Sequence, residues 1–195
     1  MRFLSAISLA ALAGACASGV TEQPTSTSAF NPSEEVYVER HMQAPMRDGA
    51  RLDTHIFVPN GATEPVPSIL IRTPYDSELN GRSGVLYQRL LDMGYAIIEQ
   101  HERGRYLSEG EFYMIPRPEE DGWDTLDWIS AQSWSDGRVA TIGCSSSAEN
   151  QPKLAAAGHP AHVAFVAMSA GVGVAEAGPF KEQGNFWRGG AWQQG

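Results

Sequence analysis

The sequence of 195 residues is poor in cysteine and in positive charge. It contains only two cysteines, Cys16 and Cys144, so it does not encode the disulfide framework that holds small secreted domains together. Lysine and arginine number 14 against 23 aspartate and glutamate residues, which gives a net charge of -9. Because nucleic acids are bound through clustered basic side chains, this deficit argues that no nucleic acid is a partner.

The apolar sequence near the N-terminus is too short to cross a membrane. Residues 3–13 form an apolar run, but a helix that spans a bilayer needs about 20 residues. A single charge, Arg2, precedes this run, and the small residues Ala13-Gly14-Ala15 follow it. This order is typical of a secretory signal peptide, so residues 1–15 are predicted to be removed on export.

Cys16 directly follows the small residues at the end of this leader. The sequence Leu12-Ala13-Gly14-Ala15-Cys16 resembles a bacterial lipobox, in which the cysteine is acylated and becomes the new N-terminus. The alternative is an ordinary secretory signal cleaved at the same place, with Cys16 incidental. We favour the lipoprotein, because the cysteine stands at the one position that acylation requires.

The segment after Cys16 agrees with an anchored, exported protein. Residues 16–34 are rich in serine, threonine, proline and glycine, which predicts a flexible tether. The protein is therefore expected to be periplasmic, or a membrane-anchored lipoprotein of a bacterium. Its only expected contact with the membrane is the N-terminal lipid anchor.

Residues 35–195 carry the apolar patterns of a folded domain. Two alternating segments joined by Asp48-Gly49 predict a β-hairpin. Continuous apolar runs after it indicate buried strands, and segments with apolar residues at helical spacing separate these runs. The expected strands are 35–42, 51–58, 66–73, 95–100, 139–142 and 163–168, and the expected helices are 83–93, 119–131 and 146–157.

Strands that alternate with helices predict an α/β fold, whose sheet is mostly parallel and begins with an antiparallel hairpin. In such sheets, functional sites gather at the carboxyl ends of the strands. Tyr75, His101 and Ser145 each follow the end of a predicted buried strand. We therefore expect these three side chains to meet at one edge of the sheet.

Ser145 stands where a buried strand turns into a helix. The sequence Gly143-Cys144-Ser145-Ser146-Ser147 matches most of the pattern G-x-S-x-G, with Ser147 in place of the last glycine. This pattern holds a serine on a strained strand-to-helix turn, which exposes the hydroxyl and aims backbone N–H groups at the same point. From these residues alone, a structural turn is a simpler interpretation than a nucleophile.

Several short motifs, in their order along the chain, resemble one family of hydrolases. That family comprises X-Pro dipeptidyl peptidases, cocaine esterase and α-amino-acid ester hydrolases. The resemblance covers nearly everything from residue 35 to residue 195, and so many ordered matches are hard to attribute to chance. The motifs are Met46-Arg47-Asp48-Gly49-Ala50-Arg51-Leu52, Arg72-Thr73-Pro74-Tyr75, Arg103-Gly104-Arg105, Ser108-Glu109-Gly110, Asp121-Gly122-Trp123-Asp124-Thr125 and Trp134-Ser135-Asp136-Gly137-Arg138-Val139.

The resemblance implies the N-terminal half of an α/β-hydrolase fold, without the family's helical cap and C-terminal β-jelly-roll. It implies a serine hydrolase with a small ester or peptide substrate, no cofactor, and an acyl-enzyme at Ser145. Tyr75 matches the tyrosine whose phenol is one oxyanion donor, and the backbone N–H of Ser146 is the other. Three family positions differ, because Ser146 replaces a tyrosine, Ala148 replaces a glycine and His101 replaces an aspartate.

The family's catalytic acid and histidine have no match in this sequence. They come from loops after later strands, in the order serine, acid, histidine. After Ser145 the only histidines are His159 and His162, which precede a strand and so belong to the wrong edge of the sheet. We therefore expect a fragment of a serine hydrolase that cleaves esters or N-terminal peptide amides. The alternative is a catalytically inactive, lipid-anchored remnant or a partner-binding protein.

The remaining candidate residues are assigned structural roles. Three histidines are expected at the surface or in loops: His101, His159 and His162. Glu109, Glu111 and the acidic residues 119–121 resemble metal ligands, but acidic side chains also suit the start of a helix, so no metal is predicted. Cys144 is expected to be a small buried residue and not a nucleophile.

Overall fold

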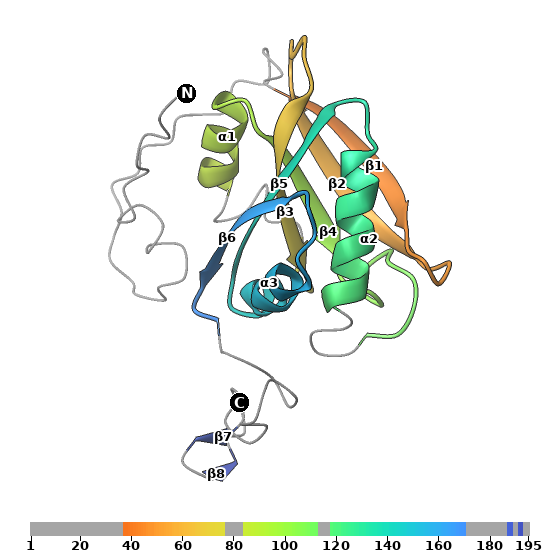
Figure 1. Cartoon of the computed structure of the whole chain (residues 1–195), viewed down its shortest axis with the longest axis vertical. Coiled ribbons are helices and arrows are strands. Elements are labelled where there is room, and N and C mark those ends of the chain that lie inside the picture. Colours follow the sequence, from red (N-terminus) through yellow and green to blue (C-terminus); the bar gives the residue numbers. More distant parts are fainter. Residues whose placement is uncertain (1–36, 77–83, 113–117, 171–186, 189–190, 193–195) are drawn as a thin grey trace.

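The computed structural model describes residues 37–76, 84–112, 118–170, 187–188 and 191–192. The predicted signal peptide, the tether and Cys16 lie outside these residues. In the part of the chain that is described, no helix is both long enough and apolar enough to cross a membrane. The elements, drawn in Figure 1, are β1 (Tyr37–Pro45), β2 (Arg51–Pro59), β3 (Val66–Thr73), α1 (Gly84–Asp92), β4 (Ala96–His101), α2 (Pro118–Ser130), β5 (Ser135–Cys144), α3 (Ser146–Ala157), β6 (His162–Met168), β7 (Trp187–Arg188) and β8 (Ala191–Trp192).

Six of the strands form one sheet in the order β1-β2-β4-β3-β5-β6. β1 pairs antiparallel with β2, and β2 pairs antiparallel with β4. β4, β3, β5 and β6 run parallel to one another. The predicted α/β class, with a mostly parallel sheet that begins with an antiparallel hairpin, is confirmed.

The hairpin turn forms where the sequence predicts it. Gly49 has a φ of +89°, in the left-handed region that glycine enters without a steric penalty. Its N–H donates to the carbonyl of Met46 at 2.9 Å, and the N–H of Ala50 donates to the carboxylate of Asp48 at 3.2 Å. The short acidic side chain thus bonds to the backbone two residues ahead, which is the usual role of aspartate in a turn.

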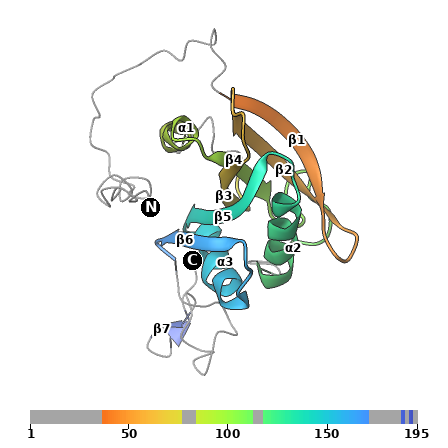
Figure 2. The same cartoon turned by 45° about the horizontal axis from the view of Figure 1, so that its top comes forward.

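Helices cover both faces of the central sheet, with α2 and α3 on one face and α1 on the other, as Figure 2 shows. The position of β3 between these two layers of helices explains why its sequence is apolar without interruption. Leu70 packs in the cluster that contains residues of α2 and α3, whereas Ile69 and Ile71 pack with residues of α1. Successive side chains of a strand point to opposite faces, so a strand covered on both faces is apolar at successive positions.

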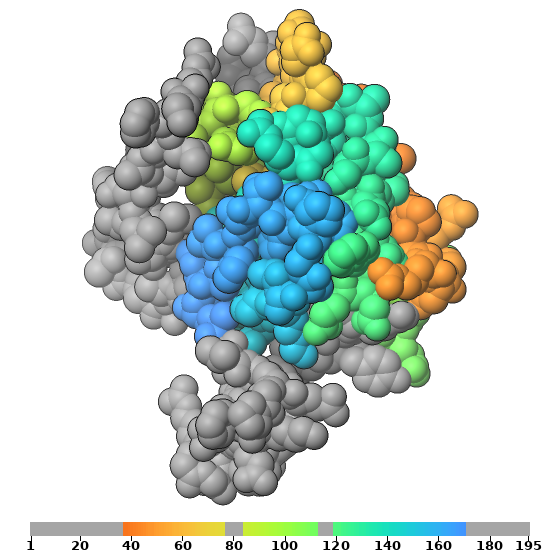
Figure 3. All heavy atoms as spheres, viewed as in Figure 1, coloured from red at the N-terminus to blue at the C-terminus, as the bar shows by residue number. Residues whose placement is uncertain are grey.

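β6 differs from its prediction. The sequence predicts a buried strand at 163–168, but β6 is the last strand of the sheet and is largely exposed. Val163, Phe165 and Val166 are 58, 46 and 40% exposed, and Figure 3 shows β6 at the surface beside α3. An apolar β-branched run predicts a strand correctly, but it does not show whether another element packs against that strand.

The apolar cluster between α2 and the sheet gives a test of the core. Leu126 on α2 is fully buried in the cluster with Ile98 and Leu154. Leu126→Ala is expected to lower the free energy of unfolding by about 2–5 kcal/mol, because it removes buried methyl groups and leaves a cavity. Urea denaturation followed by circular dichroism measures the loss.

Val163→Ala is the matched control for that substitution. Val163 is 58% exposed, so its truncation is expected to change the unfolding free energy by no more than about 0.5 kcal/mol. Equal losses in the two variants would contradict the assignment of the core to the α2 face.

Candidate active site

Ser145 occupies a strained position between β5 and α3. Its backbone has φ 56° and ψ -125°, a conformation that costs a residue other than glycine on the order of 1–3 kcal/mol. The residue is exposed, and among the described residues no side chain bonds to its hydroxyl. Its N–H donates to the carbonyl of Met168 on β6 at 3.0 Å. The strand-to-helix turn therefore presents the hydroxyl to solvent, while the hydrogen bond to Met168 holds the backbone of Ser145 in place. The nucleophile turn of a hydrolase has the same geometry.

Gly143 allows α3 to start this close to β5. A Cβ at this position would lie far inside 3.0 Å of the carbonyl oxygen of Ser147, and 2.8 Å from the amide nitrogen of Gln151. Distances this short do not occur between real side chains and their neighbours. A glycine is therefore required two residues before Ser145, as the sequence pattern indicates.

Ser146 is the first residue of α3, so its backbone N–H has no acceptor within the helix. Backbone N–H groups at the start of a helix, together with the helix dipole, stabilise a negative charge that lies close to them. This is the property required of an oxyanion donor. The role of the Ser146 N–H as an oxyanion donor stays a prediction.

Tyr75 lies just past the end of β3, and its side chain is 43% exposed. Its N–H donates to the hydroxyl oxygen of Thr73 at 3.1 Å. The same oxygen accepts a hydrogen bond from the hydroxyl of Ser147 at 3.0 Å. Thr73 thus links the turn that carries Tyr75 to the first turn of α3, directly after Ser145.

Thr73 was not singled out as a site residue from the sequence. It was assigned only to the strand and to the motif that contains Tyr75. The available signal was a hydroxyl side chain as the last residue of a buried parallel strand, where the carboxyl ends of neighbouring strands meet.

The loop after β4 joins the same edge of the sheet through two arginines. Arg105 donates from Nε to the carbonyl of Pro74 at 2.9 Å, next to Tyr75. Arg103 binds the carboxylate of Asp121 on α2 through two hydrogen bonds of 3.0 and 2.6 Å. The hydrogen bond to Asp121 raises the pKa of Arg103 above its usual value, against the effect of burial. Both arginines of the Arg-Gly-Arg motif therefore hold the loop in place.

Glu102 connects this loop to α3. Its Oε1 accepts a hydrogen bond from Asn150 at 2.6 Å, and the residue is 1% exposed. Burial raises the pKa of the Glu102 carboxyl, while Arg72 and the hydrogen bond from Asn150 act in the opposite direction. A buried carboxylate without these partners would be strongly destabilising, so the contact fixes the position of α3 against the loop.

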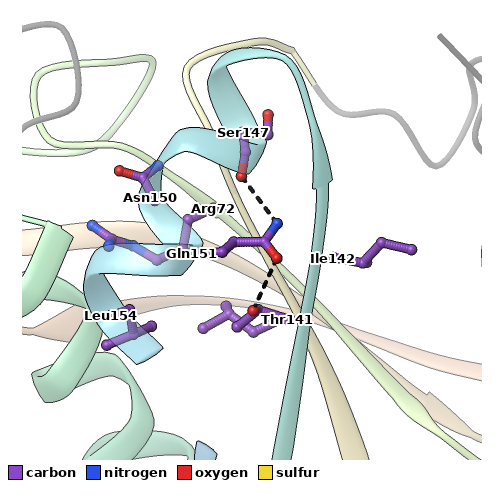
Figure 4. Close-up of a pocket in the computed structure, with 8 residues that line it drawn as sticks. Arg72, Thr141, Ile142, Ser147, Asn150, Gln151 and Leu154 are labelled. Carbon is purple, nitrogen blue, oxygen red and sulfur yellow. Dashed lines mark hydrogen bonds between the residues drawn. The ribbon is translucent and has the colours of Figure 1, made fainter. Parts of the chain in front are cut away.

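A small cavity lies beneath α3, between the helix and strands β3 and β5. Figure 4 shows Gln151 spanning it, with its side-chain nitrogen directed to the Ser147 carbonyl and its oxygen to the Thr141 hydroxyl. The volume is about 10 Å³, enough for one water molecule at most. The cavity is therefore a packing defect under the serine turn and does not accommodate a substrate.

Of the three histidines expected at the surface or in loops, His159 lies in a loop and the other two lie in strands. His101 is the last residue of β4 and is 3% exposed, and His159 is 5% exposed with its Nε2 bonded to Asp127 at 2.9 Å. His162 begins β6 and is half-buried. Burial is the main cause that lowers the pKa of His162, and the nearby charge of His159 lowers it further. The loop position predicted for His159 is confirmed, although its ring is buried. The prediction is wrong for His101, because β4 pairs with β2 and this pairing brings Asp53 against its ring.

None of these histidines is bonded to Ser145. The nitrogen Nδ1 of His101 donates to Asp53, and His162 contacts the Thr141 hydroxyl at 3.1 Å. Within the described residues, no histidine is therefore placed to act as a general base for Ser145. A serine hydroxyl is a weak nucleophile without such a base.

A group of polar side chains with metal-ligand chemistry lies on the other side of His101. His41, Asp53 and His55 each offer one ligand atom, and these atoms all lie within 4.8 Å of one another. Burial acts to raise the pKa of Asp53, but hydrogen bonds and charges from His41 and His101 outweigh it and lower the pKa. The sequence suggested metal ligands only within residues 109–121 and did not reveal this group, because the pairing of β1 with β2 brings His41 to the other two residues.

Cys144 also differs from its prediction. It is half-buried at the end of β5, whereas the sequence predicts a buried residue. The other cysteine of the chain, Cys16, lies outside the described residues.

Known proteins resemble the chain over the same region that contains this site. Residues 48–194 match the model of the X-Pro dipeptidyl-peptidase family, S15. The chain belongs to the S15 family. Cocaine esterase of Rhodococcus sp. (strain MB1 Bresler) is 38% identical to it over 125 residues, which are 62% of this chain and 21% of the esterase.

Solved structures with the same fold include two ester or peptide hydrolases. An α-amino acid ester hydrolase matches with a TM-score of 0.61 and 29% identity, over 76% of this chain and 28% of that one. An aminopeptidase from the marine sediment archaeon Thaumarchaeota archaeon matches with a TM-score of 0.61 and 30% identity, over 75% and 28% of the two chains. The S15 chain thus has the fold of the N-terminal part of an α/β-hydrolase, and it spans only 21–28% of these relatives.

Gly143→Ala tests the geometry of the serine turn. We expect the added Cβ to force α3 away from β5 and to lower the unfolding free energy by about 1–3 kcal/mol, the usual range for overpacking. The hydrogen bond from the Ser145 N–H to Met168 should weaken at the same time. Hydrogen exchange of that amide, followed by NMR or mass spectrometry, should therefore be faster in the variant.

Gly137→Ala provides the control, because Gly137 is on the same strand but has open space around it, and only its positive φ opposes alanine. This substitution strains the backbone without any contact to α3, so exchange at Ser145 should remain as in the unmodified protein. Unchanged exchange in Gly143→Ala would show that the close approach is not what holds the turn.

Proposed function

We propose that this S15 chain is the nucleophile-bearing part of a serine hydrolase that cleaves esters or N-terminal peptide amides. Its substrates would resemble those of X-Pro dipeptidyl peptidases or of α-amino-acid ester hydrolases. The family gives the reaction class, and cocaine esterase and the ester hydrolase are named for ester substrates.

The observation that carries this proposal is the backbone of Ser145. A serine with a φ of 56° has a strained backbone. Two contacts maintain this conformation: the close approach of α3 to Gly143 and the hydrogen bond from the Ser145 N–H to the Met168 carbonyl. Strained backbone at an exposed polar residue is a feature of functional sites. In a turn with only a structural role, a glycine at this position would adopt the same φ without strain.

In the proposed mechanism, the Ser145 hydroxyl oxygen attacks the carbonyl carbon of the substrate. The negative charge that forms on the carbonyl oxygen is stabilised by the Ser146 N–H and the Tyr75 phenol, each worth a factor of about a hundred or more in rate. The alcohol or amine then leaves with a proton, which produces an ester between the acyl group and Ser145. A water molecule hydrolyses this ester and regenerates the hydroxyl.

The proposed reaction also needs a base that takes the serine proton. All five histidines of the sequence are described, and the structure bonds none of them to Ser145. We propose that an acid and a histidine from a further segment of polypeptide complete the site. If no such segment exists, the inactive, partner-binding alternative is favoured.

Labelling with a fluorophosphonate probe tests the role of Ser145. The downstream reading frame identifies the protein to use, since a continuation with an aspartate and then a histidine at strand ends would supply the triad. We expect the protein with that continuation to be labelled at Ser145, and Ser145→Ala to lose the label completely. Tyr75→Phe should slow labelling by about a hundredfold, because one oxyanion donor is removed.

Ser146→Ala is the matched control, because only the backbone N–H of Ser146 has a proposed role and alanine retains it. Its labelling rate should stay within a few-fold of that of the unmodified protein. Labelling that survives Ser145→Ala would rule out Ser145 as the nucleophile, and absence of labelling in the unmodified protein would favour the inactive remnant.

We also propose that the protein is exported and anchored by lipid at Cys16. The support is the order of Arg2, the apolar run at 3–13 and the small residues before the cysteine. Mass spectrometry of the mature protein from bacterial membranes should find Cys16 as the N-terminal residue, carrying acyl chains. A free, unacylated Cys16 in the membrane-purified protein would contradict the anchor.

A further inference from the structure

The first two strands bring three metal-ligand side chains to one face of the sheet. His41 on β1 and His55 on β2 are direct partners in the antiparallel register. Asp53 precedes His55 by two residues on the same strand, so both side chains point to the same face. The three groups are therefore neighbours because of strand pairing and not because of a flexible loop.

The distances in this cluster suit a single ion. The ligand atoms of the three residues lie within 4.8 Å of one another. The rings of His41 and His55 are stacked, with centroids 4.4 Å apart and planes 15° from parallel. Asp53 contacts His41 directly and is 2% exposed, whereas the side chain of His41 is 44% exposed.

We propose that His41, Asp53 and His55 form a binding site for one divalent transition-metal ion, with Zn²⁺ as the best fit. Two imidazoles and one carboxylate are a typical ligand set for zinc, whereas Ca²⁺ and Mg²⁺ prefer oxygen ligands throughout. Ligands at about 2.0 Å from a tetrahedral zinc lie roughly 3.3 Å from one another. The exposed ring of His41 can make the small movement that closes the cluster to this spacing.

The fourth position of a tetrahedral ion is available on the exposed side of the cluster. Glu39 lies two residues before His41 on β1, and its carboxylate oxygen is 3.6 Å from Nδ1 of His55. It is 54% exposed and can take part as a fourth ligand or be replaced by water. The site is therefore accessible to an ion from solvent.

His101 is a positioning residue for the carboxylate. Its Nδ1 donates to the Oδ2 atom of Asp53 at 2.8 Å, which leaves Oδ1 directed to His41. The ring is 3% exposed, and its Nε2 has no hydrogen-bond partner among the described residues. Metal ligands are commonly oriented by such a second hydrogen bond, and loss of that bond lowers metal affinity about 10–100-fold.

Such an ion would connect β1, the edge strand, to β2 and through His101 to β4. Ligands from two strands that are joined by one turn gain affinity from the folded hairpin, and the ion in turn stabilises that hairpin. This role is separate from the proposed hydrolase activity, because the ligands are on β1 and β2 and Ser145 follows β5.

Isothermal titration calorimetry of the untagged, purified full chain with ZnCl₂ tests the site. We expect one Zn²⁺ to bind per chain, and His55→Asn and His41→Asn to weaken binding by more than about a hundredfold. His101→Asn should weaken it by about 10–100-fold with the stoichiometry unchanged. His162→Asn is the matched control, because His162 begins β6 and is not in the cluster, and it should bind as the unmodified chain does.

Circular dichroism shows whether each variant is folded. A second measurement avoids variants altogether: diethyl pyrocarbonate should modify His41 and His55 in the metal-free chain, and Zn²⁺ should protect both while His162 reacts as before. Absence of stoichiometric binding, unchanged affinity in folded His55→Asn, or modification of His41 and His55 unaffected by Zn²⁺ would each overturn the proposal.

Discussion

The structure around the serine depends on one close contact, in which the first turn of α3 passes over Gly143 of β5. Any larger residue would collide with the Ser147 carbonyl. This contact turns the chain sharply at Ser145, and the sharp turn forces the positive φ of that residue. The exposure of the hydroxyl and the free N–H of Ser146 follow from the same geometry. A single steric requirement thus produces the features that the proposed chemistry needs.

Polar side chains at the carboxyl edge of the sheet fix the position of this turn relative to the ends of β3 and β4. Thr73 accepts hydrogen bonds from both sides of the site, and Glu102 joins the β4 loop to Asn150 on α3. Arg105 adds a contact to the carbonyl of Pro74. Buried or partly buried polar groups of this kind are stable only when they find partners, so each of them specifies the position of the next.

Local patterns predicted much of the fold. The apolar run of β3 and the segment of α3 have the bounds expected from the sequence, since periodicity and strand length carry that information. The burial of β6 was predicted wrongly, because an apolar strand has the same sequence whether or not another layer covers it. His101 was expected at the surface or in a loop for a related reason. Its burial depends on Asp53, a residue far away in the sequence on a strand that pairs with β4.

Sequence information alone was enough to identify the family, the class of fold and the position of the strand-to-helix turn at Ser145. These follow from short segments, because a glycine, a serine and an apolar strand specify their own local geometry. Which polar residues meet was settled by tertiary contacts. Thr73 reaches Ser147 because β3 and β5 are neighbours, and His41 meets His55 because β1 and β2 pair in one register. A shift of that register by one residue would move His41 to the opposite face, so strand pairing, which no single segment encodes, creates the cluster.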